Sequence, residues 1–176
     1  MTSKRRRIDI VLEAEYIENL ASVDLDELRR RRDTAEDVEA QISYYRRLLQ
    51  GRMDLLDFEL RRRRGEEERN LIEALPEILA RGMILGSEPN LKHLELLPPL
   101  PSKTGRRLID RIMDDGVLTQ LPELSDAEIV EALGKLRQVE QELSSQRRQL
   151  HNVIDVLQDE IVARYRNQQD EATVPN

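Results

Sequence analysis

The stretch EQELSSQRRQLHNVID, from Glu140 to Asp155, decides the fold, because it lies where apolar residues recur at alternating steps of four and three. Ten such positions run from Ile129 to Ile161, and eight of them are apolar. A repeat sustained over this length is typical of a helix packed along a coiled-coil seam. We therefore predict one long helix, capped by Ser125 or Asp126, that ends near residue 167.

A second copy of the same pattern, EAQISYYRRLLQGRMD, runs from Glu39 to Asp54, 101 residues earlier. Subtracting 101 from the ten seam positions gives ten more, of which seven are apolar, so the two segments share period and phase. Asp24 followed by Glu27 resembles a capping box, and Gly65 is a plausible helix stop. We predict a first long helix over about residues 24–64.

The connection between the two helices, residues 65–125, contains six of the seven prolines. It predicts a short helix near 67–80, a proline-rich loop and a second short helix near 106–114. The motif centres become level if the chain folds back on itself. The predicted fold is therefore all-α: a long antiparallel two-helix coiled-coil hairpin, with short accessory helices at the N-terminus and in the connection.

The predicted division of the chain is an N-terminal arm with a short helix (1–20), a single helical-hairpin domain (21–167) and a disordered tail (168–176). Within the arm, residues 1–7 are expected to be disordered. Apolar residues between 8 and 20 follow a helical period, and a helix this short must dock on a neighbour to be stable.

Composition limits the function. The net charge of −7 argues against direct DNA or RNA binding, and no apolar stretch is long enough to span a membrane. The absence of cysteine excludes disulfides and thiolate sites, and fits a cytoplasmic protein. With two histidines and no phosphate-cradling glycine loop, we expect no catalytic residues, no metal site and no enzyme.

Polar residues repeat on both helices as a stripe, E-x3-S-x2-R-x3-Q/H-x3-D. The first copy is Glu39, Ser43, Arg46, Gln50 and Asp54, and the second is Glu140, Ser144, Arg147, His151 and Asp155. One polar seam layer often only sets the register of a coiled coil, but register does not need two copies. Charge placed in a dry seam also costs several kcal/mol, on the order of 3–5, unless it is compensated.

The chemistry of the stripes suits a guanine-containing anion held between helices. Guanidinium groups bond guanine O6 and N7 in pairs and stack on bases, and carboxylates accept hydrogen bonds from guanine N–H groups. Arg46 and Arg147 supply positive charge, and the neighbouring Arg47 and Arg148 are candidates for additional phosphate contacts.

With these residues in view, the chain resembles the RsiG family of anti-sigma factors, which bind cyclic di-GMP through one or two E-x3-S-x2-R-x3-Q-x3-D stripes. The resemblance extends over most of the chain, including RIDIVLEAEYIENLASVDLDELRRRRDTAEDVEAQISYYRRLLQGRMDLL, ALPEILA and EQELSSQRR. It implies that each stripe is a half-site and that one chain holds an intercalated dimer of cyclic di-GMP between the two helices. These two molecules are a ligand and not a cofactor. His151 departs from the family's Gln and cannot copy an amide's paired donor and acceptor.

The resemblance further implies that the loaded protein sequesters a sporulation- or motility-type sigma factor from RNA polymerase. We expect a monomer in a 1:1 complex with the sigma factor. The contacts would come from the apolar ends of the seam, from the segment Ile8 to Leu20 and from the middle helices around Leu71 to Ile84. The alternative hypothesis is a structural coiled-coil adaptor without a nucleotide ligand, whose polar layers only fix register.

Overall fold

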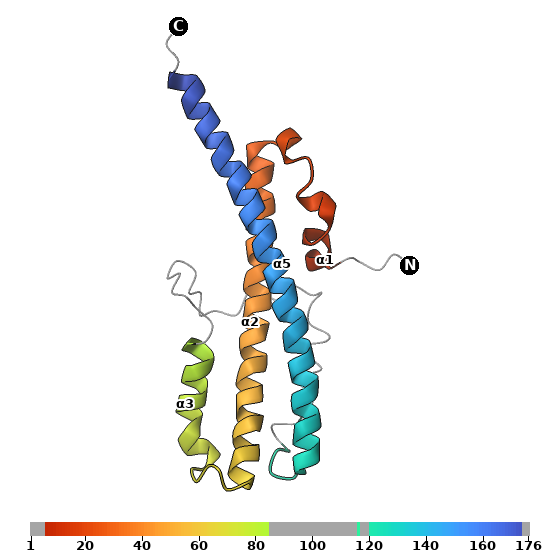
Figure 1. The fold of residues 1–176 in the computed structure, drawn as a ribbon, viewed down its shortest axis with the longest axis vertical. Helices are drawn as coiled ribbons and strands as arrows, with labels where there is room; N and C mark the ends of the chain where they lie inside the picture. The colour runs from red at the N-terminus through yellow and green to blue at the C-terminus, as the bar shows by residue number, and fades with distance from the viewer. Residues whose placement is uncertain (1–5, 85–115, 117–119, 174–176) are drawn as a thin grey trace, which may run out of the picture. The chain divides into compact units, whose positions relative to one another are not determined.

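The structure, a computed structural model, describes residues 6–84, 116 and 120–173. In order along the chain, the regular elements in these residues are α1 (Arg7–Val11), 3-10 turns at Ala14–Tyr16 and Leu20–Ser22, α2 (Leu25–Arg63), α3 (Leu71–Ile84) and α5 (Asp126–Thr173) (Figure 1). This confirms the predicted all-α fold, in which the long helices α2 and α5 pack against each other. The proline-rich loop and the helix predicted near 106–114 lie outside the described residues.

Both ends of α2 have the predicted signals. The backbone N–H of Glu27 donates to the Asp24 carboxylate at 2.7 Å, which satisfies a donor that the first helical turn leaves open. At the other end, Gly65 adopts a left-handed φ of 75°. The N–H of Glu66 then reaches the carbonyl of Arg61 at 2.9 Å, and that of Gly65 reaches Arg62 at 3.1 Å. These two bonds form a Schellman motif, so α2 ends where a glycine can adopt the required conformation.

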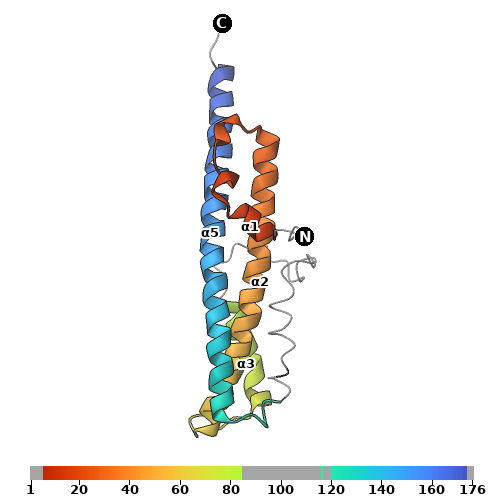
Figure 2. The same cartoon turned by 90° about the vertical axis from the view of Figure 1, so that its right-hand side faces the viewer.

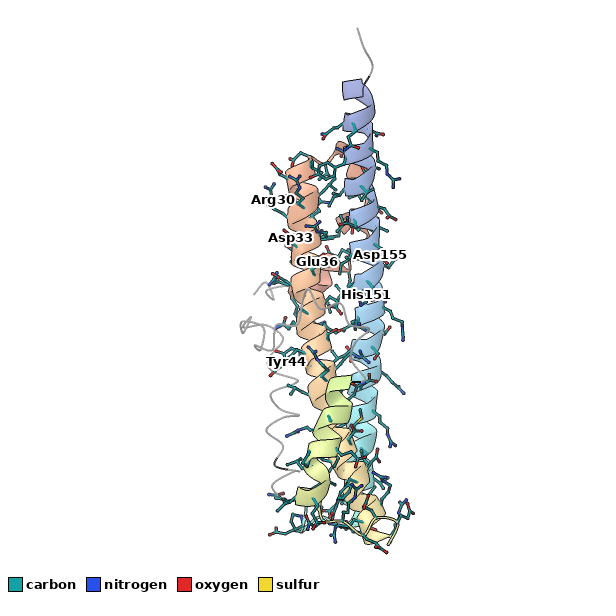
Figure 3. The ribbon with its side chains drawn as sticks, turned by 90° about the vertical axis from the view of Figure 1, so that its left-hand side faces the viewer. Arg30, Asp33, Glu36, Tyr44, His151 and Asp155 are labelled. Atoms are coloured by element: carbon teal, nitrogen blue, oxygen red, sulfur yellow. The ribbon has the colours of Figure 1, made fainter. Side chains whose placement is uncertain are left out.

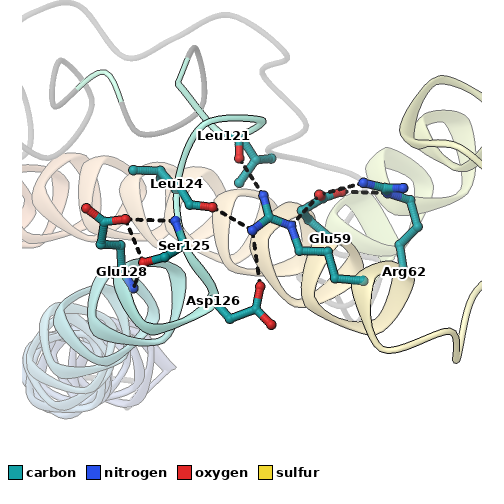
Figure 4. A network of polar contacts seen from close by, with 8 residues as sticks. Glu59, Arg62, Leu121, Leu124, Ser125, Asp126 and Glu128 are labelled. Atoms are coloured by element: carbon teal, nitrogen blue, oxygen red, sulfur yellow. Dashed lines mark hydrogen bonds and ion pairs between the residues drawn. The ribbon is translucent and has the colours of Figure 1, made fainter.

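The helix α5 begins with a reciprocal cap. The Glu128 N–H donates to Ser125 Oγ at 3.3 Å, while the Ser125 N–H donates to the Glu128 carboxylate at 2.7 Å (Figure 4). These bonds lower the pKa of Glu128, the Ser125 side chain being the largest cause. The helix continues to Thr173, beyond the end predicted near residue 167.

The heptad seam is confirmed by burial. Its buried apolar members are Leu28, Ala35, Ile42, Leu49, Leu56 and Leu60 on α2, and Ile129, Leu133, Leu136, Leu143, Leu150, Leu157 and Ile161 on α5. The remaining two, Met53 and Ile154, are half-buried and stand at matching positions of the two copies. Burial of one leucine contributes about 1.5–3 kcal/mol, so this seam, more than helix propensity, stabilises the helix pair.

The chain divides into two compact units, and α2 and α5 contribute to both. In the first unit, residues up to 41 combine with residues from 145 onward. The second unit runs from Ile42 to Ser144. The predicted division into arm, hairpin and tail stays a prediction.

In the first unit, the prediction of a single short helix over residues 8–20 is wrong. The segment instead forms α1 and two 3-10 turns, with Asn19 in a left-handed conformation (Figure 2). Val11 and Leu20 are both buried, and one regular helix is not needed to bury two anchors that lie nine positions apart. The apolar residues of this segment that we expected to face a sigma factor thus include two that pack in the chain's own core.

Hydrogen bonds between side chains and backbone carbonyls join the arm to the two long helices. The hydroxyl of Tyr16 donates to the carbonyl of Arg31 at 3.0 Å, and the Arg31 guanidinium donates to the carbonyl of Tyr16 at 2.9 Å. From α5, Arg164 donates to the carbonyls of Leu20 at 2.8 Å and Ala21 at 3.1 Å. These contacts replace the internal hydrogen bonds that a continuous helix would have supplied.

In the second unit, α3 begins at Leu71, four residues later than predicted, after a reciprocal cap between Asn70 and Glu73. Its buried residues Ala74 and Ile78 form a cluster with Phe58 of α2. Thus the part of the connection described after α2 packs back on that helix, where Figures 1 and 2 both show the two ribbons side by side.

The end of α2 is tied to the start of α5 by a charged network around Glu59, whose side chain is only 7% exposed (Figure 4). Arg62 and Arg63 both donate to this carboxylate, at 2.8 Å and 2.7 Å. Arg63 also donates to the carbonyls of Leu121 and Leu124. Hydrogen bonding from Arg62, followed by that from Arg63, lowers the pKa of Glu59 to about 2.

Candidate functional site

All ten residues of the two predicted stripes lie on the long helices, the first copy on α2 and the second on α5. The helical backbone fixes the spacing within each copy, since residues three and four apart share one face. Six of these residues form two polar clusters, one in each unit.

The cluster in the second unit is built on Glu140 of α5. Arg46 of α2 donates to Glu140 Oε1 through Nε at 3.1 Å and Nη2 at 2.9 Å. Ser144, one turn along α5, donates its hydroxyl to the same oxygen at 2.7 Å. The side chains of Arg46 and Glu140 are about one-fifth exposed, at 20% and 18%. The pair therefore sits at the edge of the seam, partly shielded from water but reachable.

The cluster in the first unit is built on Glu39 of α2. Arg147 of α5 donates Nε to Glu39 Oε1 at 2.8 Å, and His151 Nε2 lies 3.3 Å from that same oxygen. Glu39 is 18% exposed, Arg147 35% and His151 47%. This cluster is thus the more open of the two at its arginine.

The two clusters are related by exchange of the motif copies. The glutamate of the first copy meets the arginine of the second, and the glutamate of the second meets the arginine of the first. Within each unit a second contact shows that α2 and α5 run antiparallel, as predicted. In the second unit, Asp57 lies after Arg46 on α2 but contacts Arg137, which lies before Glu140 on α5. In the first unit, Arg32 lies before Glu39 on α2 but contacts Gln158, which lies after Arg147 on α5. The sequence alone did not predict this pairing, although Glu and Arg are separated by seven residues in both copies, which is the signal for it.

The remaining predicted residues lie close to these clusters along the helices. Ser43, Gln50 and Asp54 are half-buried on α2, whereas Asp155 is exposed on α5 (Figure 3). Arg47 and Arg148, the candidates for phosphate contacts, are also exposed.

Asp54 also lines a cleft of about 350 Å³ in the second unit, which the sequence analysis did not anticipate. The other residues that line it are Asp57, Leu60, Arg61, Arg64 and Ile78. These residues continue the face of α2 that carries the first stripe, since Asp57, Arg61 and Arg64 follow Asp54 at steps of three and four. The spacing was visible in the sequence, but the wall formed by Ile78 of α3 was not.

The chemistry available at each cluster is the same. A guanidinium offers a planar fork of donors to a phosphate or to a guanine edge, and a carboxylate accepts from N–H groups. Among the described residues, no group of His, Asp and Glu is arranged to hold a metal ion. In that part of the chain, too, every helix is too short or too polar to cross a bilayer.

Comparison with known proteins gives one positive finding. The RsiG-like family model matches residues 14–79 and 115–176, which include α2, most of α3 and α5. No curated protein matches the chain. The family suggests an anti-sigma role and implies a sigma factor as partner. Because the match extends over well more than half of the residues, this chain belongs to the RsiG-like family.

Proposed function

We propose that this chain is a cyclic-di-GMP-dependent anti-sigma factor. It binds two molecules of cyclic di-GMP and, when loaded, keeps a sporulation- or motility-type sigma factor from RNA polymerase. The observation that carries the proposal is the pair of Arg–Glu clusters built reciprocally from two copies of one motif. A duplicated set of guanidinium and carboxylate groups suits two copies of one guanine-containing anion.

On this proposal each cluster contacts one nucleotide. Arg46 and Arg147 bond a guanine edge or a phosphate, while Glu140 and Glu39 accept from guanine N–H groups. Ser43, Ser144 and Gln50 add neutral hydrogen bonds, and Asp54 and Asp155 complete the stripes. The exposed Arg47 and Arg148 are available for phosphates outside the seam.

Ligand binding has a cost in this arrangement, because each arginine already has a carboxylate partner. The ligand must separate Arg46 from Glu140, and Arg147 from Glu39, or share the guanidinium with them. A nucleotide that satisfies both members of a pair offsets that cost, since its guanine donates to the carboxylate while its phosphate accepts from the arginine. An anion without N–H donors satisfies only the arginine.

The direct test is isothermal titration of cyclic di-GMP into the purified chain, with cyclic di-AMP as the control ligand. The proposal expects saturation near two nucleotides per chain and no response to the adenine analogue. The double variant Arg46→Ala/Arg147→Ala should lose binding. A matched control is Arg30→Ala/Arg166→Ala, which removes two exposed arginines from the same long helices outside the stripes.

The partner is tested by linkage. If the nucleotide strengthens sigma-factor binding, the sigma factor must strengthen nucleotide binding by the same factor. Titrating the nucleotide with and without the sigma factor measures that factor. An identical affinity in both titrations contradicts a ligand-dependent anti-sigma function.

The structural adaptor remains the second candidate, because the reciprocal pairs satisfy each other without any ligand. On that hypothesis the pairs only fix the register of the two helices. No heat on titration and an unchanged melting temperature, with and without the sigma factor, would favour it.

A further inference from the structure

The two copies of the stripe differ at one of their five positions. Glu, Ser, Arg and Asp recur, but Gln50 of the first copy is replaced by His151 in the second. An amide side chain does not take up a proton near neutral pH, whereas an imidazole does. The duplication therefore places one titratable side chain in one cluster and none at the matching position of the other.

His151 is placed to act within the first-unit cluster. Its Nε2 lies 3.3 Å from Glu39 Oε1, which also accepts from Arg147 at 2.8 Å. The imidazole is 47% exposed, so an anion approaching the Arg147 guanidinium can also reach the ring. The charged groups of the cluster itself are Glu39 of α2 and Arg147 of α5. Arg148 and Asp155 lie three residues before and four residues after His151 on α5, and Glu36 lies three residues before Glu39 on α2. Figure 3 labels His151, Asp155 and Glu36 on the two helices.

We propose that His151 makes nucleotide binding at the Glu39–Arg147 cluster proton-linked, while the Arg46–Glu140 cluster binds its nucleotide without a proton. This inference rests on the proposed function. A protonated imidazole adds positive charge beside Arg147 and offers both ring N–H groups as donors, one to Glu39 and one to a ligand phosphate. The neutral ring has a single N–H, so Glu39 and the ligand compete for it.

The charges of the ligand and of the histidine determine whether binding becomes tighter or weaker as pH falls. Cyclic di-GMP carries a negative charge on each phosphate, so its presence favours the protonated form of a neighbouring histidine. Binding at this cluster must then take up protons and become tighter as pH falls through the neutral range.

Few other groups compete as the source of such a pH dependence. The chain has no cysteine, and its only other histidine is His93, which lies outside the described residues. The large carboxylate shifts move away from neutrality, since the pKa of Glu59 and that of Glu67 are lowered to about 2. His93 therefore serves as the matched control.

The experiment is titration of cyclic di-GMP at pH 6, 7 and 8 and constant ionic strength into the wild-type chain, His151→Gln and His93→Gln. We expect wild type and His93→Gln to bind about two- to threefold more tightly at pH 6 than at pH 8, which is the ratio produced when ligand binding raises a histidine pKa by about half a unit. The affinity of His151→Gln for cyclic di-GMP, whatever its value, should not change with pH. Binding heats of the wild type in buffers of different ionisation enthalpy should show proton uptake.

Three results overturn the inference. A wild-type affinity that does not change with pH shows that nucleotide binding is not linked to proton uptake. A pH dependence that persists in His151→Gln but vanishes in His93→Gln assigns the linkage to His93 and not to His151. Wild-type heats that are the same in all buffers exclude proton uptake even if His151→Gln fails to bind. These are distinct from absence of binding by all three proteins at every pH, which also refutes the proposed function.

Discussion

Breaking the Arg46–Glu140 pair tests directly whether the polar clusters contribute to the fold. Arg46→Ala removes two hydrogen bonds, at 3.1 Å and 2.9 Å, from a carboxylate that is only 18% exposed. Glu140 keeps the hydroxyl of Ser144 as a hydrogen-bond donor. The comparison pair is Arg137–Asp57, also between α5 and α2 of the second unit, with a 3.3 Å contact and side chains 58% and 44% exposed.

The expected magnitudes separate the two pairs. Leaving a shielded carboxylate without its charged donor costs about 1.5–3 kcal/mol, and we expect a coupling free energy of about 1–2 kcal/mol between Arg46 and Glu140. Exposed ion pairs contribute less than about 1 kcal/mol, because water screens the charges and ordering two long side chains costs entropy. The coupling between Arg137 and Asp57 should therefore be smaller by about twofold or more.

Two double-mutant cycles, each with both single alanine variants and the double variant, measure these couplings by urea unfolding followed by circular dichroism. Equal transitions by a second probe check that unfolding is two-state. A coupling at Arg46–Glu140 no larger than that at Arg137–Asp57 would refute the argument that burial strengthens the reciprocal pair. A gain in stability for Arg46→Ala would instead support the adaptor hypothesis with a costly polar layer.

Three further predictions concern the Glu59 network between α2 and α5, two glycines, one inside α2 and one at its C-terminal end, and the N-terminal cap of α5. The pKa of Glu59 is lowered from 4.5 to about 2, chiefly by Arg62, so its contribution to stability is present above about pH 4.5 and is lost as pH falls toward 2. In Glu59→Gln, the free energy of unfolding, measured by urea titrations, should therefore depend less on pH between pH 5 and 2.5 than in the wild type. Gly51→Ala should stabilise the chain by about 0.5–1 kcal/mol, because it lies inside α2 with open space around a new Cβ, whereas Gly65→Ala should destabilise it at φ 75°; melting temperatures of the two variants should move in opposite directions. Ser125→Ala should cost about 1 kcal/mol by removing the hydroxyl that caps α5, and a Ser125→Asp variant should recover most of it.

The long helices were predictable from the sequence because their signals are local. Heptad spacing predicts which face is buried, and a short list of residues such as Asp24, Gly65 and Ser125 predicts where each helix begins or ends. The conformation of the arm between residues 8 and 20 was not predictable from the sequence, because its backbone is held by tertiary contacts from Arg31 and Arg164. A side-chain period cannot reveal a carbonyl that is satisfied by an arginine far away in the chain.

The candidate site was predictable to a similar extent. The duplication of the motif predicted which residues form the candidate site, since Glu39 and Arg46 recur as Glu140 and Arg147 with the same spacing. It did not show that the acid of one copy bonds the base of the other, because that depends on the antiparallel register of two helices. Nor did it show the cleft at Asp54, one wall of which comes from α3.

The reciprocal pairs also bear on how a ligand can be recognised by so acidic a chain. With each stripe arginine bonded to a carboxylate, the clusters present little uncompensated positive charge to a passing anion. Selectivity therefore requires a ligand that replaces both halves of the pair, an acceptor for the guanidinium and a donor for the carboxylate. Guanine nucleotides supply both, whereas adenine offers no N–H at the ring nitrogen where guanine has one. An inorganic phosphate can pair with the arginine but leaves Glu39 or Glu140 with one donor fewer, a loss of about 1–3 kcal/mol per cluster. On the proposed function, the glutamates thus accept hydrogen bonds from the guanine and, by the same contacts, favour ligands with a guanine edge over other anions.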